Sequence, residues 1–98
     1  MENFNDIIRN SSLTLVDFYA TWCGPCKTMH PILEQLKENL GDKIRIIKLD
    51  VDDNEEISMQ YSIQSVPTLI LFRKGEIVWR QSGAISLRDL MNVISQNS

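Results

Sequence analysis

This sequence contains few of the residues that build specialised scaffolds. Its 98 residues include two cysteines, four glycines, three prolines and one histidine. Two cysteines are too few for a disulfide-stapled scaffold, and the sequence contains no repeat, low-complexity tract or linker. We expect one small domain over residues 1–98, in which a hydrophobic content of 43% is enough to form a core.

Long apolar runs and an excess of positive charge are also missing. The longest apolar runs have the length of strands, so none would span a bilayer. The sequence has no apolar stretch at its N-terminus, so we expect neither a signal peptide nor a membrane anchor. The net charge of −3 argues against nucleic acid as the main partner. We therefore expect a cytoplasmic protein with neither nucleic-acid nor membrane partners.

The two cysteines lie close together, in the run Cys23-Gly24-Pro25-Cys26. A ring closed over so few residues removes little entropy from the unfolded chain, so it is a poor structural staple. Two thiols at this spacing can instead be oxidised to a disulfide and reduced again. We therefore expect a redox-active pair in the reducing cytosol.

Hydrophobic periodicity predicts alternating helices and strands. Helices are expected over residues 2–10, 24–40 and 54–61, with a last helix after Ser86. Strands are expected over residues 13–20, 44–51, 68–73 and 76–82, the last two joined by a tight turn. Pro25 suits the first turn of the second helix, Pro31 should kink that helix, and Gly41 should end it. Ser86 is expected to cap the last helix.

This order of elements predicts an α/β fold. The first strand–helix–strand unit should be parallel with a right-handed crossover, whereas the final hairpin is antiparallel. The result is a mixed four-stranded sheet with helices on both faces.

The cysteine pair and its surroundings resemble the thioredoxin family. The run Trp22-Cys23-Gly24-Pro25-Cys26-Lys27 follows Asp17, which lies six residues before the first cysteine, and Val66-Pro67-Thr68 lies downstream. The other matching segments are Val16 to Thr21, Pro31-Ile32-Leu33, Lys48 to Asp52 and Gly83-Ala84. The resemblance extends from about residue 13 to the C-terminus, and it implies the thioredoxin fold and thiol–disulfide exchange with other proteins.

Three features depart from the family pattern. Family members usually begin with an additional edge strand, which this sequence lacks before its first predicted helix. Many carry a tryptophan where this chain has Tyr19, and His30 is unusual just before Pro31. None of these differences removes a group that the chemistry needs.

The two cysteines are expected to have different roles. Cys23 lies at a helix N-terminus, where free N–H groups and the helix dipole favour a thiolate, so it should attack the substrate disulfide. Cys26, one turn further on and less exposed, should resolve the mixed disulfide. Gly24 and Pro25, the dipeptide found in reducing members of the fold, should tune the redox properties of the pair.

Asp17 is a carboxylate within an otherwise apolar strand. Burial of a charge is costly, so the pKa of Asp17 should be raised towards the working pH. The resemblance implies that Asp17 exchanges a proton with Cys26 and that Lys48, on the neighbouring strand, lies close to it. The alternatives are a strand-end residue that reaches solvent and an ordinary surface lysine.

A substrate-docking surface is implied by the same resemblance. The Val66–Pro67 peptide bond is expected to be cis and to lie opposite Cys23, with the Val66 backbone pairing with an extended substrate. Gly83 has no side chain and so would let the substrate approach. The flat apolar patch should comprise Trp22, Gly24, Pro25, Val66 and Ala84.

Two sequence patterns resemble metal sites only incompletely. The acidic run from Asp50 to Glu56 resembles the start of a calcium loop, but Glu55 occupies the position that needs glycine. Cys23, Cys26 and His30 lack a fourth zinc ligand. We therefore predict no metal site.

The sequence therefore predicts a monomeric protein-disulfide reductase with no bound cofactor. Its partners should be disulfide-containing proteins and, from the resemblance, a thioredoxin reductase that draws on NADPH. One alternative is an oxidase or isomerase of the same fold. Another is a non-enzymatic binding module that uses the surface formed by Trp22, Pro67 and Gly83.

Overall fold

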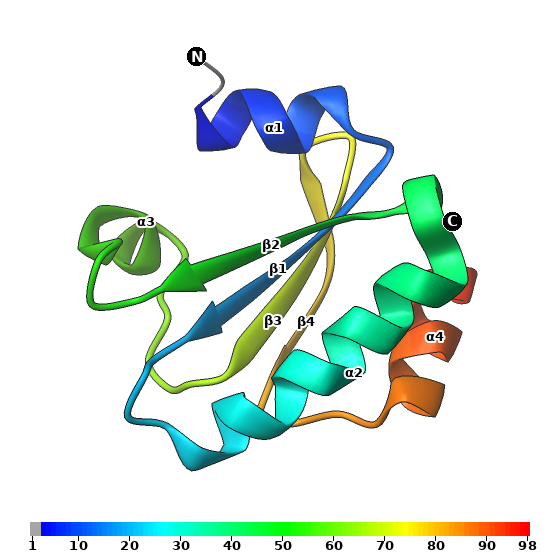
Figure 1. Ribbon diagram of the computed structural model, residues 1–98. Coiled ribbons are helices and arrows are strands. Elements are labelled where there is room, and N and C mark those ends of the chain that lie inside the picture. Colours follow the sequence, from blue (N-terminus) through cyan, green and yellow to red (C-terminus); the bar gives the residue numbers. More distant parts are fainter. Residues whose placement is uncertain (1–2) are drawn as a thin grey trace.

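Four strands form one mixed sheet in the computed structural model, which describes residues 3–98 (Figure 1). They are β1 (Leu13–Tyr19), β2 (Arg45–Asp50), β3 (Thr68–Arg73) and β4 (Glu76–Ser82), in the spatial order β2-β1-β3-β4. β2 runs parallel to β1, whereas β3 is antiparallel to both of its neighbours. The predicted mixed four-stranded sheet is thus confirmed.

Helices cover both faces of this sheet. They are α1 (Phe4–Asn10), α2 (Gly24–Leu40), α3 (Glu55–Gln60) and α4 (Leu87–Gln96), with a short 3-10 helix at Gly41–Lys43. α2 and α4 lie together on one face, and α1 and α3 lie on the other (Figure 1). No helix within residues 3–98 is long and apolar enough to cross a membrane.

Local sequence signals account for the ends of the two longest helices. α2 begins after Cys23, carries Pro25 in its first turn and ends at Gly41, whose φ of 56° suits glycine. Pro31 lies inside this helix, which continues to Leu40. α4 begins after Ser86, whose hydroxyl accepts a hydrogen bond from the Asp89 N–H at 3.1 Å, as predicted.

The other elements differ from the predicted ranges only at their ends. α1 begins at Phe4 after an Asn3 cap, and the start predicted at residue 2 lies outside the described residues. β1 stops at Tyr19, one residue before its predicted end, and β2 and α3 each lose one residue at both ends. Turns begin at Val51 and Tyr61, directly after β2 and α3. The 3-10 helix after α2 was not predicted.

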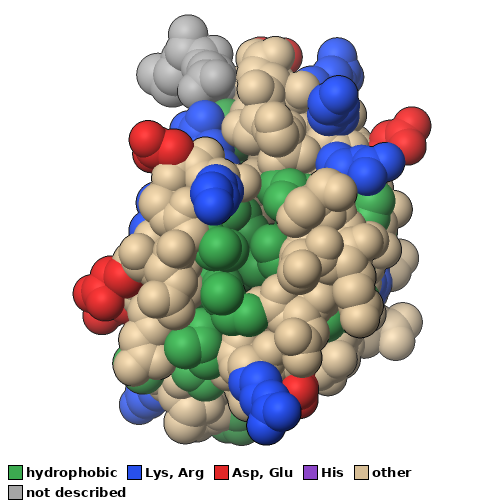
Figure 2. Space-filling view, turned by 90° about the vertical axis from the view of Figure 1, so that its right-hand side faces the viewer, with side chains coloured by type: hydrophobic (Ala, Val, Ile, Leu, Met, Phe, Trp, Pro, Cys, Tyr) green, Lys and Arg blue, Asp and Glu red, His purple; other side chains and the backbone are tan. Residues whose placement is uncertain are grey.

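Alternation along β1 divides the core into two layers. Leu13 and Leu15 pack on the face covered by α2 and α4, whereas Val16 and Phe18 pack on the face covered by α1 and α3. Asp17 follows the alternation of Leu15, so its side chain belongs to the α2 face. Figure 2 shows that hydrophobic side chains still reach the surface between the polar groups on the α2 and α4 side.

Truncation of a core side chain of α2 should destabilise the protein strongly. Leu36 is fully buried in the layer beneath α2, so Leu36→Ala should lower the free energy of unfolding by about 2–5 kcal/mol. The exposed Gln35, its neighbour in the same helix, offers a matched control, because Gln35→Ala removes little packing. Urea denaturation of the two variants measures both effects. Equal losses would show that α2 packing is not what stabilises this face.

Candidate active site

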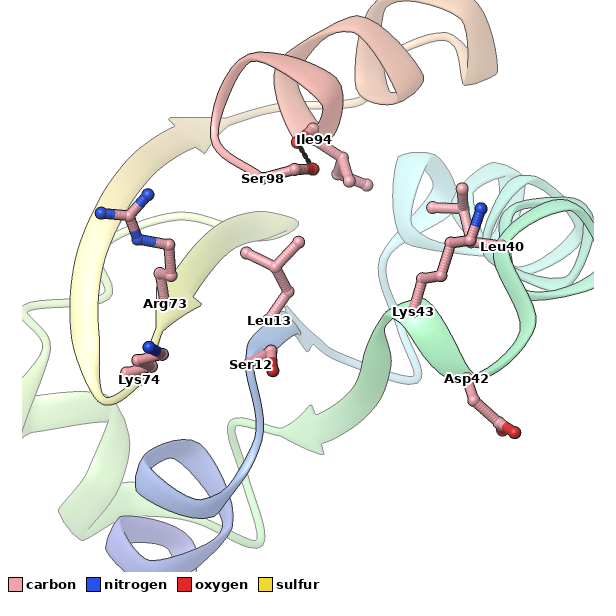
Figure 3. Close-up of a pocket in the computed structure, with 9 residues that line it drawn as sticks. All are labelled: Ser12, Leu13, Leu40, Asp42, Lys43, Arg73, Lys74, Ile94 and Ser98. Atoms are coloured by element: carbon pink, nitrogen blue, oxygen red, sulfur yellow. Dashed lines mark hydrogen bonds between the residues drawn. The ribbon is translucent and has the colours of Figure 1, made fainter.

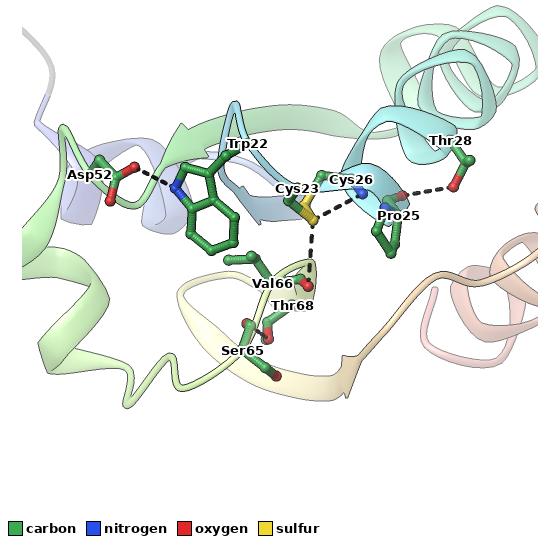
Figure 4. Close-up of a disulfide and its surroundings, with 9 residues drawn as sticks. All are labelled: Trp22, Cys23, Pro25, Cys26, Thr28, Asp52, Ser65, Val66 and Thr68. Atoms are coloured by element: carbon green, nitrogen blue, oxygen red, sulfur yellow. Dashed lines mark hydrogen bonds between the residues drawn. A yellow bond between two sulfur atoms is a disulfide. The ribbon is translucent and has the colours of Figure 1, made fainter.

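The end of β1 and the start of α2 place the two cysteines together. The Cys23 N–H donates to the Ala20 carbonyl at 3.2 Å, which closes the turn between strand and helix. Cys23 is then the N-cap of α2, and its Sγ accepts a hydrogen bond from the Cys26 N–H at 3.2 Å (Figure 4). A negatively charged sulfur at this position would be stabilised by the same N–H and by the helix dipole.

Cys23 and Cys26 form a disulfide, with their Cα atoms 5.3 Å apart. Cys23 is 5% exposed, whereas Cys26 is completely buried. The difference places Cys23 where a second molecule can reach its sulfur, and Cys26 behind it. Attack by Cys23 and resolution by Cys26 stay predictions, with which the greater exposure of Cys23 agrees.

Asp17 lies in the interior of the protein. Its side chain is completely buried, and neither carboxylate oxygen has a hydrogen-bond partner among residues 3–98. Desolvation by burial raises the pKa of Asp17 from 3.8 to about 6, although the positive charge of Lys48 acts in the opposite direction. Lys48 is the register partner of Asp17 on β2 and is exposed. The structure therefore places Asp17 in the core and Lys48 next to it.

The segment before β3 faces the disulfide from the other side. The Val66–Pro67 peptide bond is cis, as expected, and the Val66 carbonyl oxygen lies 3.6 Å from Cys23 Sγ (Figure 4). Because an oxidised sulfur carries no hydrogen, this is a contact in the disulfide form. The Gly83 N–H donates to the Pro67 carbonyl at 2.8 Å, which brings Gly83 to the same region, and the exposed Ala84 follows it in the chain.

Trp22 presents most of its ring to solvent. Its side chain is 70% exposed, which is unusual for a large apolar group. The indole Nε1 donates to Asp52 Oδ2 at 3.0 Å (Figure 4). This bond holds an exposed aromatic surface beside Cys23, where Gly24 and Pro25 are exposed as well. Asp52 was not predicted to take part, since nothing local relates it to a tryptophan 30 positions earlier.

The two unusual residues of the site region contact each other. The rings of Tyr19, at the end of β1, and His30, in α2, meet edge-to-face with their centroids 5.5 Å apart. Such pairs stabilise a packed arrangement beyond the area that they bury. The departures from the family pattern at positions 19 and 30 thus form one packing unit.

One cavity of the structure is lined by none of the residues of the disulfide site. This cavity of about 670 Å³ lies at the opposite end of the sheet, between the start of β1 and the ends of α2 and α4 (Figure 3). Leu13, Leu40 and Ile94 form its apolar part, with Lys43 on one side and Arg73 on the other. Residues 3–98 contain no group of His, Cys, Asp or Glu side chains arranged to hold a metal ion.

Comparison with known proteins agrees with this geometry. The family described as Thioredoxin matches residues 1–96. The chain belongs to the thioredoxin family. It is 40% identical to "Thioredoxin" of Haemophilus influenzae over 97% of this chain and 90% of the relative. It is 42% identical to "Thioredoxin" of Bacillus subtilis over 85% and 83% of the two chains.

A solved structure supports the same assignment. The oxidised form of mitochondrial thioredoxin 3 from Saccharomyces cerevisiae superposes with a TM-score of 0.86 at 34% identity, covering 95% of this chain and 86% of that one. The thioredoxin fold is therefore confirmed. This membership, together with the Cys23–Cys26 pair, makes the protein a thiol–disulfide oxidoreductase.

Proposed function

We propose that this thioredoxin-family protein works as a single domain that reduces disulfide bonds in other proteins. The observation that carries the proposal is the disulfide at the start of α2, with Cys23 partly accessible and Cys26 buried behind it. The exposed ring of Trp22 beside the disulfide favours a protein surface as substrate.

The reaction begins with the reduced protein. The Cys23 thiolate attacks one sulfur of the substrate disulfide, forms a mixed disulfide and releases the other substrate sulfur as a thiolate. Cys26 then loses its proton and attacks Cys23 Sγ. The bond between Cys23 and the substrate breaks, and the second substrate sulfur leaves. Two electrons pass to the substrate, which becomes a dithiol, and the protein is left as the disulfide described here.

Asp17 is the proposed proton acceptor for Cys26. Asp17 follows Leu15 on the α2 side of β1, and Cys26 is buried in α2, which covers that face. With a pKa of about 6, Asp17 is mostly ionised at neutral pH and still basic enough to take a proton. Lys48 is proposed to keep this carboxylate from becoming too strongly protonated, because its positive charge favours the ionised form.

We propose that the substrate docks as an extended segment between the Val66–Pro67 backbone on one side and Gly83 on the other. Val66 and Pro67 offer a backbone edge, and Gly83 leaves open space where a side chain would stand. Trp22 and Ala84 complete the patch. Gly24 and Pro25 are proposed to tune how strongly the dithiol form is favoured.

A thioredoxin reductase using NADPH is the proposed source of electrons, so the protein itself needs no bound cofactor. We propose that it acts as a monomer in the cytoplasm. The alternatives are an isomerase or oxidase of the same fold and a binding module that does not use its thiols.

Reduction of insulin by dithiothreitol tests the proposed function. We expect the protein to accelerate the precipitation of the insulin B chain and a Cys23→Ser, Cys26→Ser double variant to give the uncatalysed rate, because no thiol remains to attack. The same assay driven by a reductase with NADPH tests the electron source. A double variant as fast as the parent would contradict the role of the cysteines and favour the binding module.

A further inference from the structure

α3 ends in a backbone conformation that normally requires glycine. Ser62 has a φ of 54°, in the left-handed region. Its N–H donates to the Met59 carbonyl at 3.0 Å, and the Ile63 N–H donates to the Ser58 carbonyl at 2.9 Å. This pair of bonds closes many helix C-termini. The next two carbonyl groups, those of Tyr61 and Ser62, are bound by a side chain from another element.

That side chain is Arg80, which projects from the edge strand β4. Its Nη1 donates to the Tyr61 carbonyl and its Nη2 donates to the Ser62 carbonyl at 2.8 Å. The planar guanidinium can serve two neighbouring acceptors at once, which a lysine ammonium matches poorly. A positive charge is also favourable where helix carbonyls are unpaired. Arg80 therefore fixes the point at which the chain leaves α3.

The far end of the same segment is also held by β4 and the residue after it. The Thr68 hydroxyl donates to the Ser65 carbonyl at 2.7 Å and lies 3.1 Å from the Ser82 hydroxyl. Since Thr68 has a single hydroxyl hydrogen, Ser82 must donate in that second bond. The Gly83 N–H donates to the Pro67 carbonyl at 2.8 Å. Both ends of residues 61–67, which carry Val66, are thus fixed from β4.

We propose that Arg80 is a positioning residue for protein substrates. It holds residues 61–67 so that the Val66 backbone stands beside Cys23 in the position that an extended substrate needs. α3 has only six residues and would fix its own C-terminus poorly. The inference rests on the proposed function, because it concerns how that reaction binds its substrate. Arg80 touches neither the sulfurs nor Asp17, so thiol chemistry itself should not depend on it.

The kinetics of Arg80→Gln test this inference. With insulin as substrate, we expect kcat/KM to fall roughly three- to tenfold through a higher KM, with kcat nearly unchanged, because a displaced docking edge weakens productive binding. Arg80→Lys should recover part of the loss. Reaction of the reduced protein with dithiobis(nitrobenzoate), a small disulfide that needs no extended docking, should proceed at the parent rate. Arg88→Gln, an exposed arginine in α4, is the matched control.

Amide hydrogen exchange separates positioning from a general loss of stability. In Arg80→Gln the amides of Ile63 and Val66 should exchange faster, while those of β1 stay protected. An unchanged KM for insulin would overturn the inference, as would equal slowing with the small disulfide. If the parent protein fails to reduce insulin, the proposed function itself is overturned. The assay of the parent protein alone shows this, without reference to the Arg80 variant.

Discussion

A Cys26→Ser variant is expected to remain covalently attached to its substrate through Cys23. The serine hydroxyl cannot replace the thiol that breaks the mixed disulfide, so the reaction should stop halfway. In the assay driven by a reductase with NADPH, turnover of insulin should fall to the uncatalysed level. A stable adduct should form when the reduced variant is mixed with insulin in the absence of dithiothreitol. Non-reducing electrophoresis followed by mass spectrometry measures the adduct and locates its sulfur. The expectation rests on the 5% exposure of Cys23 against the complete burial of Cys26.

The Cys23→Ser variant is the control for this trap. With Cys26 buried, no accessible thiol remains, so neither turnover nor an adduct is expected. Trapping by Cys23→Ser but not by Cys26→Ser would reverse the order of attack. Dithiothreitol should release the trapped substrate in every case, because the link is a disulfide.

Replacement of Asp17 by asparagine should stabilise the protein at neutral pH and slow its reaction. The folded state raises the pKa of Asp17 from 3.8 to about 6, so folding favours the protonated acid. Stability due to this group is complete below pH 3.8, declines as the pH rises to about 6, and is then constant at its lower value. A difference of about two pH units corresponds to about 3 kcal/mol. Asp17→Asn should therefore gain up to about 3 kcal/mol at pH 7 and nothing near pH 3.

The same variant loses the proton acceptor for Cys26. Resolution of the mixed disulfide should slow by about 100-fold, the lower end of general-base contributions. Urea denaturation at pH 3 and pH 7, together with insulin turnover, measures both effects. The exposed Asp53, changed to asparagine, is a matched control that should alter neither. A less stable but fully active Asp17→Asn protein would show that Asp17 is a structural partner of Lys48.

Much of the fold could be predicted because its signals are local. Pro25 and Gly41 mark the ends of α2, and Ser86 marks the start of α4, since each residue acts through the backbone next to it. The apolar residues on either side of Asp17 likewise agree with a β1 strand that is buried along nearly its whole length. The short turn at Gly41–Lys43 was missed because no hydrophobic periodicity accompanies three residues.

The parts of the site that were not predicted depend on contacts between distant segments. Asp52 binds Trp22 across 30 positions, and Arg80 binds Ser62 across 18. Exposed charged residues such as these look like ordinary surface groups in a sequence, because nothing local shows which backbone they will reach. The order of the strands in the sheet brings these distant segments of the chain together. The roles of the individual site residues, from Cys23 and Asp17 to Gly83 and Ala84, all stay predictions.

The reduction potential of the Cys23–Cys26 pair distinguishes a disulfide reductase from an oxidase or isomerase of the same fold. The reduced and oxidised forms can be quantified after equilibration with defined ratios of reduced and oxidised dithiothreitol or glutathione. The value of about −270 mV is a known property of thioredoxins and was not obtained from this geometry; a reductase should lie close to it. A potential near −180 mV, typical of protein disulfide isomerase, would contradict the account and show that the pair works as an oxidant or isomerase.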